Sequence, residues 1–140
     1  MTTNNLQSIR FTGLLYFVDD LAVNDIINFK KELKRAKEED EAPWTLNDCV
    51  LICDKKLGTE RVKFDINVKG HYECFFIGFL FDDGKFLGKI KYTRDANLQD
   101  DILNGKYIKI GKGKIILCGV WDDNGSKLNS IIELSLLKKP

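Results

Sequence analysis

The chain has 140 residues, which suits one ordinary domain and is too short for two. Hydrophobic residues make up 44% and charged residues 31%, a globular balance that excludes a disordered or fibrous chain. The 22 Lys and Arg residues nearly balance the 21 Asp and Glu residues, so the net charge of +1 excludes a strongly basic nucleic-acid binder by bulk charge. We therefore expect a single domain over residues 1–140.

The N-terminal part of the sequence predicts one strand and then one helix. Residues 9–17 are rich in apolar and aromatic side chains, as in a strand. Asp19 or Asp20 can cap a helix, and the residues after them repeat at spacings of three and four, which predicts an amphipathic helix over about 20–40. Pro43 disfavours helical geometry in the residue before it and so ends the helix. The apolar stripe of this helix consists of Ala22, Ile26, Phe29, Leu33 and Ala36.

After Trp44 the sequence predicts strand after strand. The clearest alternation of apolar and polar residues is at 61–69, which indicates one buried and one exposed face. Most connectors are short and rich in Gly, Asp and Asn, which favours tight hairpins and excludes parallel pairing. Only 93–105 is long, and we expect a helical turn there at 98–103. The other expected strands are 49–54, 72–81, 86–92, 107–110, 114–121 and 128–137.

The segment 72–81 is apolar on both faces, and this decides the expected shape. The helix stripe can cover one face, and closure of the sheet or a second protein must cover the other. Curling into a barrel also removes open strand edges. We predict a mainly β (α+β) fold: an antiparallel up-and-down meander of seven or eight strands, curled into a barrel or half-barrel, with the helix packed against it.

The residue types that build reactive centres are few or badly spaced. The chain has one His, no Cys-x-x-Cys pair among its four Cys and no Gly-x-Ser-x-Gly motif. We therefore predict no enzyme activity, no metal and no cofactor, with the cysteines as ordinary reduced thiols. The N-terminal residues do not resemble a signal peptide and no apolar run is long enough to span a membrane, which predicts a cytoplasmic protein with no membrane partner.

An acidic run at the end of the helix is the first candidate for partner binding. Glu38, Glu39, Asp40 and Glu41 lie where the helix dipole is negative and acids are unfavourable. The plain interpretation is a solvated helix end, and the functional one is a surface retained for a basic partner such as a toxin or an enzyme. Trp44 follows, an aromatic of the kind enriched at interfaces, although it can equally plug a barrel end.

These features predict a protein-binding inhibitor or immunity-type protein, with a homodimer through 72–81 as another form of assembly. Nucleic acid is not expected, because the basic helix face lacks interleaved aromatics. The alternative is a barrel that carries a small apolar ligand. The order of strand, helix and meander resembles calycin-type carriers in outline, but the triplet Gly119-Val120-Trp121, similar to their Gly-x-Trp element, lies near the other end of the chain, so we do not assign the family. The expected cavity-lining residues are Phe64, Phe76, Tyr92 and Trp121.

Overall fold

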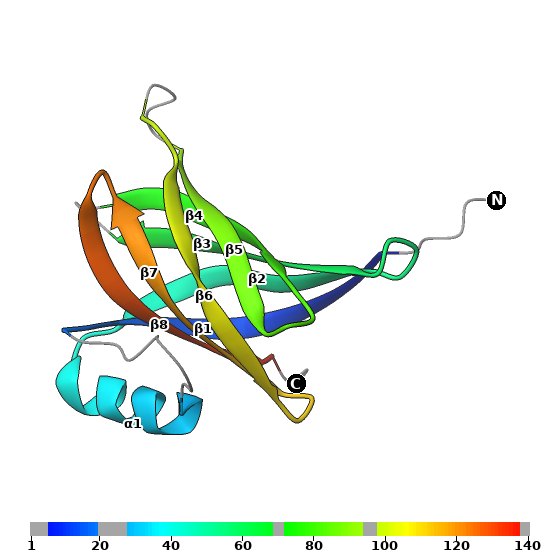
Figure 1. The fold of residues 1–140 in the computed structure, drawn as a ribbon, viewed down its shortest axis with the longest axis horizontal. Coiled ribbons are helices and arrows are strands. Elements are labelled where there is room, and N and C mark those ends of the chain that lie inside the picture. Colours follow the sequence, from blue (N-terminus) through cyan, green and yellow to red (C-terminus); the bar gives the residue numbers. More distant parts are fainter. Residues whose placement is uncertain (1–5, 20–27, 69–71, 94–97, 138–140) are drawn as a thin grey trace.

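The computed structural model describes residues 6–19, 28–68, 72–93 and 98–137. Eight strands in this part of the chain form a closed antiparallel barrel, in which each strand lies next to its neighbours in sequence (Figure 1). The predicted mainly β, up-and-down barrel is therefore confirmed. The strands are β1 (Leu6–Val18), β2 (Trp44–Asp54), β3 (Thr59–Val68), β4 (Tyr72–Leu80), β5 (Lys85–Tyr92), β6 (Asp101–Ile110), β7 (Lys114–Asp123) and β8 (Ser126–Leu136).

The barrel closes through β1, which pairs with β2 on one side and with β8 on the other. Phe11, for example, lies opposite Cys49 on β2 and opposite Leu136 on β8. Each described strand thus has a neighbour on both sides, which protects its backbone groups from pairing with another chain. The inward-facing side chains alternate with outward-facing ones along the strands, as the closed geometry requires.

Strand β2 is longer than the sequence pattern indicates, because a bulge hides its alternation. Asp48 has a positive φ of 51°, and the register with β3 shifts between Asn47 and Val50. Leu46 and Cys49 are three residues apart and both are buried in the barrel. A bulge inserts one extra residue and so breaks the period of two on which strand recognition depends.

The prediction of a helical turn at 98–103 is wrong for residues 101–103, which belong to a strand. Strand β6 begins at Asp101, which lies opposite Ile90 of β5. Asp101 and Leu103 are buried, whereas Ile102 between them is exposed. An inward carboxylate at the start of the strand disguised the alternation, because a buried charge is not part of the usual apolar pattern.

The described helix, α1 (Phe29–Glu39), begins later than the sequence predicts. Its N-cap is Asn28, whose Oδ1 accepts a hydrogen bond from the backbone N–H of Lys31 at 3.2 Å, so neither of the expected aspartates caps it. The predicted helical residues 20–27, including two members of the apolar stripe, lie outside the described residues. The helix ends before Pro43, as expected, with Asp40 as its C-cap.

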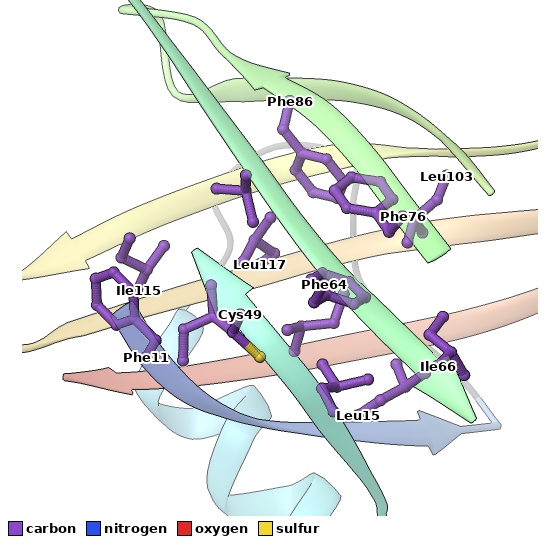
Figure 2. Packing of buried hydrophobic residues seen from close by; sticks show 14 of the residues in the cluster. Phe11, Leu15, Cys49, Phe64, Ile66, Phe76, Phe86, Leu103, Ile115 and Leu117 are labelled. Carbon is purple, nitrogen blue, oxygen red and sulfur yellow. The ribbon is translucent and has the colours of Figure 1, made fainter. Parts of the chain in front are cut away.

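The main core fills the inside of the barrel with aliphatic and aromatic side chains (Figure 2). Trp121, Phe64 and Phe76 are fully buried there. Large buried side chains of this kind each stabilise the folded chain by roughly 1.5–3 kcal/mol. This core explains why the inward faces of the strands are apolar, but it leaves the outward faces to be covered separately.

A second, smaller core lies outside the barrel, beneath α1. Leu33 and Ala36 of the helix pack in it with side chains from β1, β7 and β8. Figure 1 shows the helix beside β1 and β8, away from β4 and β5. Barrel closure covers the inner face of β4, but the described part of the helix stripe, which could have covered the outer face, packs on β1, β7 and β8 instead. The barrel residues of the second core are Tyr16, Val18, Ile116, Cys118 and Ile131.

Candidate functional site

The four acids at the end of α1 differ in what they contact. The carboxylate of Asp40 accepts hydrogen bonds from the backbone N–H groups of Phe17, at 3.0 Å, and Ala42, at 3.1 Å. Glu39 pairs with Arg35 at 3.3 Å. Glu38 and Glu41 are exposed, and within the described part of the chain neither forms an ion pair. Asp40 therefore anchors the helix to β1, and the run offers less negative charge to a partner than its sequence suggests.

Trp44 lies at one end of the barrel and is partly buried against the main core. Its ring meets the ring of Phe17 edge-on, with centroids 4.8 Å apart, and that of Trp121 at 6.5 Å. Edge-to-face contacts of this kind are favourable for aromatic rings. These contacts suit a plug at the barrel end, and partner binding by Trp44 stays a prediction.

The interior candidates Phe64 and Phe76 lie against each other inside the barrel. Their rings are stacked with centroids 4.9 Å apart, and both are fully buried (Figure 2). The ring of Phe76 also covers Gly88, where an added Cβ atom would lie 2.2 Å from it, and Gly78, where the distance would be 2.4 Å. The two glycines are paired across β4 and β5, so together they make room for one phenylalanine ring.

The other two interior candidates, Tyr92 and Trp121, meet at a buried carboxylate. Trp121 donates a hydrogen bond from Nε1 to Oδ2 of Asp101 at 2.9 Å, and the hydroxyl of Tyr92 donates to the same oxygen. Burial, and next the charge of Asp101, raise the pKa of Asp123 close by. The buried carboxylate of Asp101 thus has its partners within the barrel, so the cluster is satisfied internally.

The buried groups of this region are poor nucleophiles. Burial raises the pKa of Cys74 to about 12 and that of Cys49 to about 11, so both remain thiols at neutral pH. The pKa of Tyr92 is also raised, by burial first and then by its bond to Asp101. These thiols and this hydroxyl therefore stay protonated at neutral pH and serve to pack and hydrogen-bond the core.

The opposite situation holds on the outer side of the barrel, where apolar side chains reach solvent. We call this surface the β4 face and define it by Phe75, Ile77 and Phe79 of β4, Leu87 of β5 and Ile102 of β6. Phe79 is 44% exposed, Leu87 51% and Ile102 48%. Phe79 lies directly opposite Leu87 in the pairing of β4 with β5. Exposed apolar patches of this kind commonly mark interaction sites.

Positive side chains lie beside the β4 face and within it, where Lys89 stands between Ile77 and Ile102. Ile77 lies between Lys63 of β3 and Lys89 of β5, and Arg61 lies opposite Phe79. The ammonium group of Lys63 is 5.1 Å from the centre of the Phe75 ring, a cation–π contact. Among the residues that the structure describes, Arg61, Lys63 and Lys89 form no ion pair.

Sequence reasoning singled out the apolar run 72–81 but did not identify the β4 face. The missing information was the position of α1, because a helix of that length can reach any side of a barrel. The alternation of Leu87 with lysines on the outward side of β5 was a usable signal, since strands that face water normally carry only polar residues there.

The described residues contain no group of three or more His, Cys, Asp or Glu side chains arranged to hold a metal ion. A search of the same residues for a helix with the length and apolarity needed to cross a bilayer finds none. No protein-family model matches the chain, and neither the curated proteins nor the solved structures contain a significant match.

Proposed function

We propose that this protein is a non-enzymatic binding module that docks onto an acidic, amphipathic segment of a partner protein through the β4 face. The observation that carries the proposal is an apolar surface on the outer side of the barrel on which Phe79, Leu87 and Ile102 are about half exposed, beside cations that form no ion pair among the described residues. Burial of such side chains by a partner is favourable in proportion to the area removed from water.

The charges around the β4 face favour an acidic partner. Arg61, Lys63 and Lys89 border its centre, and Lys91 beside them pairs with Asp100 at 3.3 Å. A two-fold contact between two copies would bring these cations toward one another, and like charges across an interface are costly. The same cations would attract and orient an acidic segment. We therefore expect a partner of the opposite sign to the one expected from the acidic helix end.

The side chains of the β4 face favour protein over nucleic acid. Single-stranded nucleic acids stack their bases on aromatic rings. Three of the five residues of the face, Ile77, Leu87 and Ile102, are aliphatic and offer no ring. Aliphatic and aromatic side chains together suit the apolar side of a helix or an extended peptide.

The alternative, a carrier with its ligand inside the barrel, is less well supported. A ligand there would have to displace Phe64, Phe76 or Trp121, which are fully buried and in contact with other core residues. Close packing makes such a displacement expensive. Surface recognition requires no rearrangement of the core, and it is compatible with an inhibitor or immunity role in which the bound segment belongs to the working surface of the partner.

Quantitative affinity capture with matched variants tests this proposal. The wild-type protein and a Phe79→Ser/Leu87→Ser variant are each immobilised and exposed to nuclease-treated extract of the native host, and retained proteins are quantified. We expect one partner to be retained by the wild type and lost with this variant. The isolated partner should also be lost with a Lys63→Glu/Lys89→Glu variant, and its binding should weaken with salt.

The control is Leu57→Ser, because Leu57 is 70% exposed and lies in the turn between β2 and β3, outside the β4 face. This variant should retain the partner. The proposal is overturned if no protein distinguishes the wild type from the face variants, or if charge reversal leaves binding unchanged. A concentration-dependent dimer that the face variants abolish would also overturn it, since it would assign the face to self-assembly.

A further inference from the structure

A groove lined by lysines lies between α1 and the barrel, on the side away from the β4 face. Its apolar floor is formed by Leu33 of α1, Ile110 at the end of β6 and Ile116 of β7, and its volume is about 400 Å³. The basic residues around this floor are Lys30, Lys34 and Lys37 of α1 and Lys114 of β7. We call these seven residues the lysine groove.

The positive charge of the lysine groove is only partly compensated. Glu133 is buried beneath the helix, and its Oε2 forms ion pairs with Nζ of Lys114 at 2.8 Å and Nζ of Lys37 at 3.3 Å. Burial alone would raise the pKa of Glu133, but the two lysines outweigh this and lower it, so the carboxylate stays ionised. Glu133 thus pairs with two of the four lysines of the groove.

Lys30 and Lys34 carry the excess charge. Within the described part of the chain neither has an ion-pair partner, and they stand four residues apart on the same side of α1. Like charges at this spacing repel and destabilise a helix. Among the described residues these two ammonium groups therefore repel each other at the rim of an apolar groove, and an anion bound between them would relieve the repulsion.

We propose that the lysine groove binds a small anionic amphiphile, a single-chain carboxylate whose apolar body lies along the Leu33, Ile110 and Ile116 floor and whose carboxylate lies between Lys30 and Lys34. The volume of about 400 Å³ falls within the roughly 300–1,000 Å³ of small-molecule sites, which suits a free molecule. The ion pairs of Glu133 leave Lys37 and Lys114 committed, so the headgroup is expected at the other pair.

Calorimetric titration with three related probes tests the two halves of this inference. Decanoate has both the charge and the tail, 1-decanol lacks the charge, and acetate lacks the tail. We expect saturable binding of decanoate with one site per chain, and at least roughly tenfold weaker binding of the other two probes. Backbone amide shifts in a decanoate titration should be largest at Leu33, Ile110 and Ile116.

Matched variants of exposed lysines locate the headgroup. Lys30→Gln/Lys34→Gln should weaken decanoate binding about tenfold, because two charge contacts near the surface are removed. Lys31→Gln is the control, since Lys31 is exposed on the same helix but does not line the groove. Circular dichroism establishes that all variants keep the fold.

Three results would overturn the inference: binding of 1-decanol as tight as that of decanoate, equal losses in the Lys31 control and the double variant, or no binding of decanoate with tight binding to vesicles of phosphatidylglycerol. The last result would assign the lysines to a membrane surface. The test is independent of partner capture, because Phe79→Ser/Leu87→Ser should bind decanoate like the wild type.

Discussion

The outer surface of this barrel carries apolar side chains on two sides, and these side chains are buried on one side and partly exposed on the other. Beside β1, β7 and β8, outward residues such as Ile131 and Cys118 are buried under α1, at 0% exposure. Beside β4 and β5, Phe79 and Leu87 are 44% and 51% exposed. The strands of both sides look equally apolar in the sequence, so their difference in exposure arises from the placement of one helix.

The charges follow the same division. On the helix side, Glu133 is buried and held by two lysines. On the open side, Arg61 and Lys89 form no ion pair among the described residues. The clearer difference is in the apolar side chains, which are buried under α1 on the helix side and partly exposed on the open side. This contrast is the basis for assigning the open side to a partner.

The largest expected difference in stability comes from truncating one leucine on the helix side and one on the open side. Leu33→Ala, beneath the helix, should lower the free energy of unfolding by about 2–3 kcal/mol, because a buried leucine leaves a cavity. Leu87→Ala, on the open side, should change it by no more than about 0.5 kcal/mol. Urea denaturation of both variants measures the difference. Equal losses would mean that Leu87 is as structural as Leu33, which contradicts the comparison.

The next effect concerns the buried acid of the helix side. Glu133→Gln should lower the free energy of unfolding at pH 7 by about 1 kcal/mol, a value reduced because both lysines are partly solvated. The pKa of Glu133 is lowered in the fold. The stabilisation by its ion pairs is therefore present above the ordinary pKa of a glutamate and is lost as the pH falls through the lowered pKa of the folded state. The difference between wild type and variant should therefore shrink in acid. A difference that is constant with pH would refute the ion-pair explanation.

An acid on the open side should behave with the opposite sign. Burial, and next the charge of Asp48, raise the pKa of Asp65 in the fold. Its contribution to stability is therefore present below the ordinary pKa of an aspartate and is lost as the pH rises through the raised pKa of the folded state. Asp65→Asn should raise the free energy of unfolding by roughly 0.5 kcal/mol at pH 7 and leave it unchanged near pH 3. Denaturation at the two pH values measures this, and a loss of stability at pH 7 would contradict it.

The smallest effect concerns the cation that covers Phe75. Lys63→Gln removes the cation–π contact on an exposed strand and should cost at most about 0.5 kcal/mol. The same substitution should weaken binding of an acidic partner clearly more than it affects folding. Denaturation and titration with the captured partner provide the two numbers, and a substitution that harms only folding would remove Lys63 from the proposed interface.

Most of the fold could be predicted from local patterns, and the candidate surface could not. The alternation in β3 and β5 and the short hairpins predict the antiparallel meander, since period and turn chemistry are local properties. The start of β2 was hidden by the bulge at Asp48, and the start of β6 by the inward Asp101. Both errors occur where a local pattern is broken by an interaction across the barrel.

The predicted partner residues illustrate the same limit. Asp40 is acidic in the sequence, but its carboxylate is occupied by the backbone of Phe17, 23 residues away along the chain. Trp44 looks like an exposed anchor beside a charged run, yet it packs edge-on against Phe17 at the barrel end. A residue type indicates what a side chain can bind, and only the arrangement of distant strands decides what it does bind.

The sequence by itself determined that this protein is built of antiparallel strands with an amphipathic helix, because hydrophobic period, turn residues and connector length act over a few residues. The tertiary structure alone decided which outward face of the barrel the helix covers and therefore which apolar row stays in contact with water. The physical reason is that burial is a property of pairs of surfaces, and α1 can cover β1, β7 and β8 only by leaving β4 and β5 uncovered.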